Sequence, residues 1–517
     1  MTFEIVFVLL SLLGMVAALI ADKMRPGMIL FSVVVLFLCA GILTPKEMLE
    51  GFSNKGMITV ALLFLVSEGI RQSGTLGQVI KKVLPQGKTT VFKAQLRILP
   101  SVAFISAFLN NTPVVVIFAP IIKHWAKSVN LPATKFLIPL SYVTILGGIC
   151  TLIGTSTNLV VHGMILEAGF EGFSMFELGK VGIFIAIAGI IYIFLFSKRL
   201  LPDARPDTAV PDEEVEEGEK LHRVEAVLGA RFPGINKKLK DFNFQRHYGA
   251  EVKEIKTRNG QRFVSNLEEV VLHEGDTLVV MADDTFIPTW GESSVFVLLT
   301  NGNEPDTTGK KKRWFALLLL VLMIVGATVG ELPITKEMFP DIKLDMFFFV
   351  SITTIIMAWT NLFPARKYTK YISWDILITI ACAFAISKAM VNSGVADSVA
   401  KFIIGLSDDY GPHVLLAMVF IITNLFTELI TNNAAAALAF PLALSISAQL
   451  GVSPTPFFVV ICMAASASFS TPIGYQTNLI VQGIGNYKFT DFVRIGLPLN
   501  IITFLISIIL IPLIWNF

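Results

Sequence analysis

Long apolar runs recur along nearly the whole chain, and they restrict its fold more than any other feature of the sequence. A helix needs about 20 mostly apolar residues to cross a bilayer. Ten runs are expected to cross it, at residues 2–21, 28–43, 57–72, 131–167, 180–196, 314–329, 344–362, 372–392, 454–485 and 495–517. The sequence therefore predicts an all-α polytopic membrane protein.

The composition agrees with a lipid-embedded chain and excludes other classes. Of the 517 residues 54% are apolar and 15% are charged, against about 25% charged in an average soluble domain. Too few charged side chains are present to cover the surface of a soluble fold of this size. The formal net charge of +2 gives no field that would recruit nucleic acid, so no nucleic-acid partner is expected.

A segment of about 110 residues interrupts the membrane pattern. It begins with three prolines and an acidic run at residues 212–217, which is expected to be a solvated linker. Strands are expected at residues 221–229, 252–257 and 276–282, and a polar helix at 236–242. The predicted organisation is a first transmembrane repeat (1–199), a small α+β domain with its linkers (200–312) and a second transmembrane repeat (313–517).

The two membrane parts are related in sequence. Residues 153–163 recur as 473–483 with seven of the eleven positions identical, and Gln72-Ser73-Gly74 matches Asn392-Ser393-Gly394. Five crossings precede the insert, and this odd number makes the second repeat enter the membrane from the opposite face. An inverted-topology repeat of this kind is typical of secondary transporters.

Lys and Arg in the short loops fall on one side of the membrane if both termini lie outside. That side is expected to be the cytoplasm, and it includes the insert.

Polar residues interrupt four of the apolar stretches. The Gly154 and Gly474 segments, each followed by a Thr-Asn pair, lie inside runs too long for one span and predict two broken helices. Asn pairs lie midway in residues 98–122 and 414–448, each with a downstream proline, and predict two re-entrant hairpins with polar tips.

These residue types suit the binding of an anion together with cations. Asn, Thr and Ser offer neutral oxygens to Na⁺ and N–H or O–H donors to an oxyanion, and the N-termini of half-helices add positive dipole ends. No Lys or Arg occurs in either Asn tip or either break. A dianion there would need co-bound cations to offset its charge.

The tips Asn110-Asn111-Thr112 and Thr431-Asn432-Asn433, each with a proline ten residues after its first member, resemble the paired hairpin motifs of the divalent anion–sodium symporter (DASS) family of the ion transporter superfamily. The resemblance covers both membrane parts. It implies Na⁺-coupled symport of sulfate or a C4-dicarboxylate by an elevator-type homodimer in a bacterial inner membrane. Asn110 and Thr431 stand where the family has Ser, and Asn433 where it has Thr.

The resemblance also implies the site residues. The substrate would be bound by Asn110, Asn111, Thr112, Thr431, Asn432, Asn433, Thr157 and Thr477. Na⁺ would lie near Asn111, Gly154, Asn158, Asn432, Gly474 and Asn478.

The insert resembles a TrkA-C (RCK C-terminal) domain in its segments 224–227, 237–244, 248–250 and 275–278. Such domains commonly dimerise and bind small regulators, so a cyclic dinucleotide is an expected regulatory ligand.

Alternative interpretations remain at this stage. The buried amides and hydroxyls could join helices by hydrogen bonds without binding a ligand. Glu428 could be a cation ligand, a protonatable group or part of a buried network. Glu68 and Lys388 could pair across the repeat interface, and extension of both to the surface is the favoured expectation. A Na⁺/H⁺ or oxyanion antiporter and a ligand-gated channel are the competing functions. No catalytic motif is present, so an enzyme is not expected.

Overall fold

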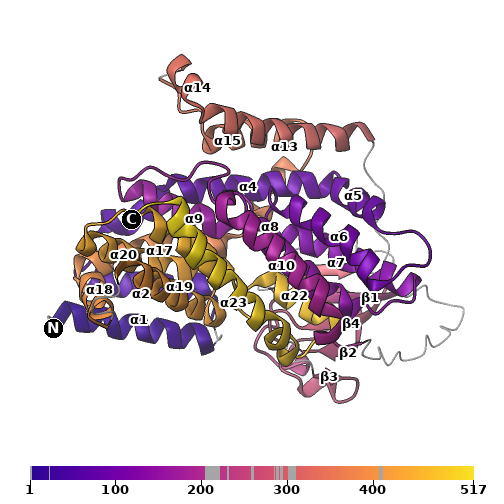
Figure 1. Cartoon of the computed structure of the whole chain (residues 1–517). Helices are drawn as coiled ribbons and strands as arrows, with labels where there is room; N and C mark the ends of the chain where they lie inside the picture. The colour runs from indigo at the N-terminus through magenta and orange to yellow at the C-terminus, as the bar shows by residue number, and fades with distance from the viewer. Residues whose placement is uncertain are drawn as a thin grey trace, which may run out of the picture.

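The computed structural model describes residues 3–21, 24–203, 222–229, 232–257, 261–283, 286, 290, 295–300, 310–339, 341–406 and 411–517. The predicted acidic linker at 212–217 lies outside these residues. Helices dominate, as the apolar runs predict. A small sheet, formed by residues that lie between the two helical parts in sequence, is at one end of the molecule (Figure 1).

Ten α-helices precede the sheet: α1 (Phe3–Ala21), α2 (Pro26–Cys39), α3 (Pro45–Glu50), α4 (Lys55–Gln72), α5 (Thr75–Val83), α6 (Val91–Ser106), α7 (Asn111–Ser128), α8 (Leu137–Gly148), α9 (Ser156–Glu167) and α10 (Gly179–Leu200). Eleven follow it in the described residues: α13 (Lys310–Gly330), α14 (Pro333–Met338), α15 (Met346–Trp359), α16 (Tyr368–Tyr371), α17 (Trp374–Asn392), α18 (Val395–Leu406), α19 (Gly411–Leu429), α20 (Asn432–Leu450), α21 (Thr455–Ser466), α22 (Gln476–Gly485) and α23 (Phe489–Ile514).

Eight helical stretches in the described part of the chain are long and apolar enough to cross a membrane. This finding supports a multi-pass membrane protein, but the eight differ from the ten predicted crossings. Helices α2 and α15 have only 14 residues each. Helices α19 and α20, expected as short hairpin arms, have 19 residues each and meet the length criterion themselves.

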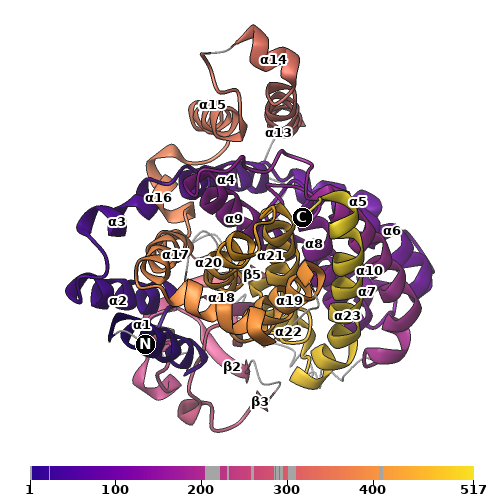
Figure 2. The ribbon, with the colours of Figure 1, turned by 60° about the vertical axis from the view of Figure 1, so that its left-hand side comes forward.

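The contacts between helices are reciprocal in the two parts of the chain. Helix α2 packs on α17 and α15 packs on α4; likewise α7 packs on α22 and α20 packs on α9. Helices α10 and α23 pack against each other and run side by side in Figure 2. A twofold relation between repeats produces such reciprocity, and the inversion of the second repeat in the membrane stays a prediction.

The repeated Gly74 and Gly394 have the same backbone role. Each follows a long helix, α4 or α17, and has a positive φ, +70° and +75° respectively. Glycine adopts this left-handed conformation without the penalty that a Cβ atom brings. The matching tripeptides therefore reflect the same turn built twice.

The insert contains a five-stranded antiparallel sheet in the order β3-β2-β4-β1-β5. Its strands are β1 (His222–Leu228), β2 (Glu251–Lys256), β3 (Arg262–Phe263), β4 (Thr277–Ala282) and β5 (Phe296–Thr300). Strands β1, β2 and β4 match the three expected strands. Aromatic side chains form a core of its own beneath the sheet, among them Phe232, Phe242, Phe244, Tyr248 and Phe296.

The polar helix expected at residues 236–242 is wrong. Asn236 has a positive φ of 61°, and the N–H groups of Asn236 and Leu239 donate to the carbonyls of Leu272 and Val270. These tertiary hydrogen bonds hold the segment away from helical geometry, and only Leu239–Asp241 forms a 3₁₀ turn. The helix α11 (Phe244–Tyr248) begins where the Asn243 side chain caps it by accepting from the Arg246 N–H.

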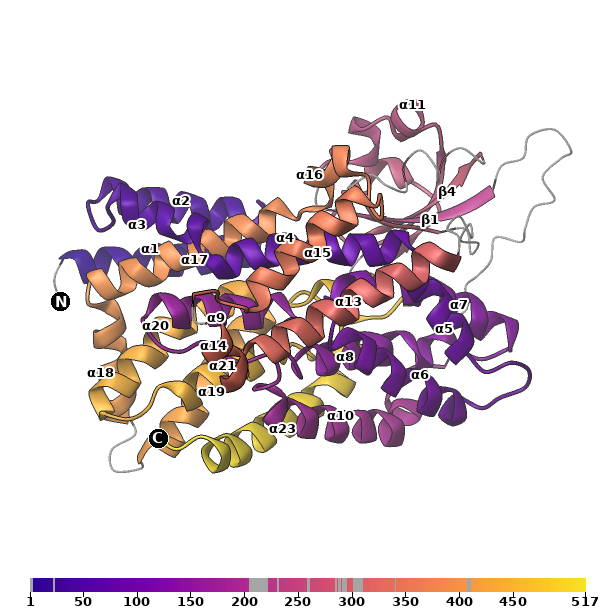
Figure 3. The same ribbon diagram turned by 90° about the horizontal axis from the view of Figure 1, so that it is seen from above.

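The sheet and the N-terminal helices lie toward opposite ends of the molecule (Figure 1, Figure 3). Helices α13 and α15 run along one outer side. The polar tips and breaks lie on the helices between these parts.

Candidate functional site

Two helices are interrupted at the repeated glycine segments. The chain leaves helical geometry between Gly148 and Ser156 and again between Ser466 and Gln476. The side chain of Asn158 spans the first interruption, and its Nδ2 donates to the Thr151 carbonyl at 2.9 Å. Asn478 does the same in the second, with Nδ2 2.8 Å from the Ser468 carbonyl and 3.1 Å from that of Thr471. Each asparagine thus satisfies carbonyls that the missing helical turn leaves free.

The Asn pairs lie at the two short connections between antiparallel helices. Asn110 and Thr431 are the N-cap residues of α7 and α20, so each tip leads directly into a helix N-terminus. Asn111 is fully buried, and its Oδ1 accepts from the Ser106 hydroxyl at 2.7 Å. A side-chain hydrogen bond thus fixes Asn111 within the first tip, and in the second tip the Asn433 N–H donates to Asn432 Oδ1 at 3.0 Å.

Each tip contacts the broken helix of the other part of the chain. From the first tip, Asn111 Nδ2 donates to the Tyr475 hydroxyl at 2.7 Å, and Thr112 Oγ1 lies 3.4 Å from Gln476 Oε1. From the second tip, Asn433 Oδ1 accepts from the hydroxyls of Ser156 and Thr157, both at 3.2 Å. The N-termini of α7, α9, α20 and α22 consequently meet in one region.

The Tyr475 side chain lies between the two contacts that join a tip to a broken helix. Its hydroxyl is also 2.9 Å from Thr155 Oγ1, and the Asn432 side chain lies nearby. Of the predicted site residues, the structure brings Asn111, Thr112, Asn433 and Thr157 into contacts across the two parts of the chain. Thr477 and Asn478 are instead buried and bond to the Ser141 hydroxyl, at 2.9 and 2.7 Å.

Partial exposure distinguishes the members of this group. Asn111, Thr157, Asn158, Asn433, Thr477 and Asn478 are buried, whereas Asn110, Thr112, Ser156, Asn432 and Gln476 reach the surface. A small hollow of about 10 Å³, enough for about one water molecule, adjoins Asn110 and Ser156. Ser67 of α4 and the apolar Leu320 and Met323 of α13 complete one wall of it. Among the partly exposed residues, Asn110 and Ser156 line this hollow.

The electrostatics of this region come from backbone rather than from charged side chains. No Lys or Arg contact to the tips or breaks is present in the described part of the chain. Four helix N-termini supply positive dipole ends and free N–H groups, an arrangement that favours an anion.

One buried oxygen in the first break is suited to a cation. Asn158 Oδ1 is buried without any hydrogen-bond partner, whereas Oδ1 of the equivalent Asn478 accepts from the Ser141 hydroxyl at 2.7 Å. An unpaired buried acceptor is costly, and a cation ligated by neutral oxygens removes that cost. The predicted Na⁺ position near Asn158 therefore fits the residues present.

Glu428 belongs to a hydrogen-bonded network beside the second break. Its Oε1 accepts from the Ser470 backbone N–H at 2.9 Å and from Asn500 Nδ2 at 2.7 Å. This observation agrees with the network interpretation of Glu428, while its Oε2 has no partner.

The expected surface position of Glu68 is wrong. Glu68 is 9% exposed and forms an ion pair with Arg71 at 2.7 Å, one turn along α4, and it also accepts from Gln72. A charged partner within the same helix replaces water and permits this burial. Lys388 is exposed, as expected.

Several residues of this region were missed by sequence reasoning. Tyr475 lies within the repeated motif, but at a position where the two copies differ, so identity between copies did not mark it. Asn500 was detectable as a lone amide in the apolar helix α23, and Ser141 carried no signal.

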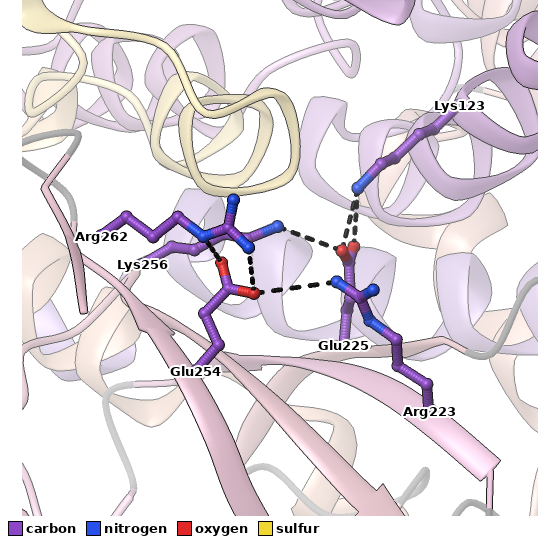
Figure 4. Close-up of polar contacts among 6 residues, drawn as sticks. All are labelled: Lys123, Arg223, Glu225, Glu254, Lys256 and Arg262. Carbon is purple, nitrogen blue, oxygen red and sulfur yellow. Dashed lines mark hydrogen bonds and ion pairs between the residues drawn. The ribbon is translucent and has the colours of Figure 1, made fainter. Parts of the chain in front are cut away.

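The inserted sheet contacts the same helices that lead away from the site (Figure 4). Lys123 of α7 points at Glu225 of β1, with Nζ 2.9 Å from Oε2, and Lys256 of β2 approaches Glu225 Oε1 at 3.3 Å. On α22, Gly483 packs so closely on β4 that a Cβ atom there would lie 2.5 Å from Thr277 Oγ1. The sheet therefore rests on α7 and α22, whose N-termini form half of the site.

Lys123 and Lys256 determine the ionisation of Glu225. Burial by itself raises the pKa of Glu225, but the two ammonium groups outweigh it and hold the pKa at about 2, below the ordinary 4.5. Because the pKa is lowered in the folded state, this stabilisation is complete above pH 4.5 and is lost as the pH falls toward 2.

Replacing Lys123 by methionine is expected to loosen the sheet from α7. The loss of a hydrogen bond to a charged group costs about 1.5–3 kcal/mol, so amide exchange protection in β1 should fall by roughly ten-fold or more. The difference from wild type should be complete near neutral pH and should narrow as the pH falls below 4.5 toward 2, because Glu225 is then protonated in both proteins. Lys253→Met, which removes only an exposed pair with Glu251, is the matched control and should change little. Equal protection of β1 in K123M and wild type would contradict the role of the pair.

Comparisons with known proteins agree with this architecture. A model of the citrate transporter family, CitMHS, matches residues 16–445 and 342–516. An uncharacterized transporter of Synechocystis sp. is 30% identical over 94% of this chain and 93% of its own length. Sodium/sulfate cotransporter 1 of Chlamydomonas reinhardtii is 22% identical over 93% of this chain and 86% of its own length. Solute carrier family 13 member 4 of Homo sapiens is 25% identical over 30% of this chain and 24% of its own length.

These matches indicate a membrane transporter rather than an enzyme. The family model extends over both helical parts and therefore includes both tips and both breaks. The chain belongs to the citrate transporter (CitMHS) family.

Proposed function

We propose that the protein is a secondary active transporter that moves a divalent anion, sulfate or a C4-dicarboxylate, together with Na⁺. The observation that carries the proposal is the reciprocal contact between tips and breaks, which gathers four helix N-termini without a basic side chain. Such a site attracts an anion but leaves its second charge uncompensated, and cations bound beside it supply the compensation. The relative named sodium/sulfate cotransporter supports this coupling.

In this proposal the exposure of each residue decides whether it contacts the substrate directly. The substrate is bound at Asn110, Asn111, Thr112, Thr431, Asn432, Asn433, Thr157 and Thr477, with the partly exposed members in direct contact and the buried ones fixing their geometry. Na⁺ lies near Asn111, Gly154 and Asn158 in one half and near Asn432, Gly474 and Asn478 in the other.

The transport movement is proposed to be of the elevator type in a homodimer of inverted repeats, as in the DASS family. The hollow between the first tip and α13 supports it, because a site at the boundary between two helix groups can change its access when one group slides along the other. The repeat boundaries at 199 and 313 are part of the same proposal.

The insert is proposed to be a cytoplasmic TrkA-C-like domain of a bacterial inner-membrane protein, regulated by a small ligand such as a cyclic dinucleotide. Its contacts with α7 and α22 support a regulatory role, since any shift of the sheet would act on the helices that form the site.

Uptake into proteoliposomes tests the proposed function. Labelled sulfate or succinate should accumulate when Na⁺ is imposed outside, and replacement of Na⁺ by K⁺ should reduce the initial rate by at least about ten-fold. A fluorescent pH indicator inside the vesicles reports whether protons move instead. Absence of any Na⁺-dependent anion flux would refute the proposal.

A further inference from the structure

The two copies of the broken-helix motif differ at one position that lies at the centre of the site. Thr155 in the first copy corresponds to Tyr475 in the second, and the side chains contact each other at 2.9 Å between their hydroxyl oxygens. A short residue in one copy and a long aromatic one in the other make the site asymmetric. The asymmetry needs an explanation, because Gly, Thr and Asn around this position are identical in both copies.

The Tyr475 ring is buried, and its hydroxyl lies where side chains from three elements meet. Asn111 Nδ2 donates to it at 2.7 Å from the first tip, Thr155 meets it from the first break, and Asn432 approaches from the second tip. Since the hydroxyl oxygen accepts from Asn111, its own proton remains available to Thr155 or to a bound anion.

This position of Tyr475 limits the depth of the site. Tyr475 is 7% exposed and Thr155 1%, while Thr112, Ser156, Asn432 and Gln476 around them remain partly exposed. The buried tyrosine ring therefore occupies the interior between the tips and the breaks. The groups that remain accessible are the hydroxyls and amides of the more exposed residues around it.

A small set of accessible donors outside a buried ring suits a compact anion. Sulfate carries its two charges on one tetrahedral centre, so a single ring of donors can reach all of it. A C4-dicarboxylate holds its two carboxylates at opposite ends of a carbon chain and needs a longer cavity with donors at both ends. Citrate is branched and larger still.

From this geometry we infer that Tyr475 is a specificity-determining residue, which restricts the transporter to small tetrahedral oxyanions of the sulfate kind by filling the space that a dicarboxylate would require. The inference rests on the proposed function and selects one of its two substrate classes. The hydroxyl positions the Asn111 and Asn432 side chains for the anion, and the ring excludes longer ligands.

Substitution at Tyr475 separates these two roles. Tyr475→Thr places in the second copy the residue of the first and removes the ring. Tyr475→Phe keeps the ring and removes the hydroxyl. Tyr192→Phe is the matched control, because Tyr192 is a buried tyrosine of α10 whose hydroxyl donates to the Ile495 carbonyl, away from the site.

The measurement is Na⁺-driven uptake of labelled sulfate into proteoliposomes, with unlabelled succinate, citrate or sulfate as competitor. In wild type and Y192F only sulfate should compete at millimolar concentration. In Y475T the succinate concentration for half-inhibition should fall at least about ten-fold, a typical effect of opening a pocket by the volume of a few carbon atoms. Y475F should still exclude succinate, while its KM for sulfate should rise by roughly ten-fold.

Every outcome decides the inference. Wild-type uptake of succinate at a rate similar to that of sulfate would overturn it while leaving Na⁺-coupled anion transport intact. A folded Y475T protein that still excludes succinate would also overturn it. If Y475T binds but does not transport, thermal stabilisation of the purified protein by succinate supports the inference, and stabilisation by sulfate alone overturns it. Lack of Na⁺-dependent uptake of every anion by wild type would instead refute the proposed function, and the inference with it.

Discussion

Replacing Gly474 by alanine is expected to abolish transport and to lower strongly the yield of folded protein. A Cβ atom at this position would lie 2.1 Å from Ser468 Oγ and 2.2 Å from the Thr427 carbonyl oxygen. Both distances are far below van der Waals contact, and the carbonyl belongs to the last turn of α19, just before the second tip. Overpacking of a tight interior costs about 1–3 kcal/mol even where side chains can adjust, and backbone adjusts less.

Gly405 offers the matched control. It lies in α18, and a Cβ atom there would meet nothing within 4 Å. Gly405→Ala should be neutral or stabilise the helix by about 0.5–1 kcal/mol. Size-exclusion chromatography in detergent and the melting temperature compare the two variants. A G474A protein with wild-type stability and uptake would show that the second break does not pack as closely as these distances state.

Replacing Asn158 by alanine is expected to produce the largest change in Na⁺ dependence. The substitution removes the unpaired buried Oδ1 that fits a cation, and it also leaves the Thr151 carbonyl without its donor. Loss of a contact to a charged group costs about 1.5–3 kcal/mol. The Na⁺ concentration for half-maximal uptake should therefore rise by roughly 10- to 150-fold.

Stability measurements separate this effect from misfolding. Na⁺ should raise the melting temperature of the purified wild-type protein more than K⁺ does, and N158A should reduce the difference. Asn392→Ala, at the exposed end of α17, removes an amide that bonds to the Ile42 carbonyl and to Glu47, and should retain wild-type Na⁺ dependence. If N158A and N392A behave alike, no Na⁺ site lies at the first break.

The arrangement of the site explains why amides and hydroxyls were identifiable in the sequence but their roles were not. Asn111 and Asn433 occupy similar places in similar motifs, yet Asn111 donates to Tyr475 whereas Asn433 accepts from Ser156 and Thr157. Which group donates depends on partners more than 270 residues away in the chain. Periodicity and spacing contain no information on such pairs.

Glu68 and the segment 236–242 show the same limit of prediction from sequence alone. Glu68 was expected to extend to the surface from a position near a helix end, but Arg71, one turn away, stabilises it inside. The segment 236–242 was expected to be helical, but hydrogen bonds to residues 270–272 hold most of it out of helical geometry and leave only a 3₁₀ turn. In both cases a specific ion pair or hydrogen bond outweighed the general preference of the residue type for the surface or for a helix.

The sequence by itself determined the membrane character, the duplicated motifs, the glycines at which helices stop and the strands of the insert, because apolar run length, repetition and backbone conformation are local properties of the chain. Only the tertiary structure decided that each tip bonds to the opposite broken helix, that Tyr475 fills the centre, that Asn158 retains an unpaired oxygen and that the sheet rests on α7 and α22. These features depend on the distances between residues far apart in sequence, and packing alone fixes them.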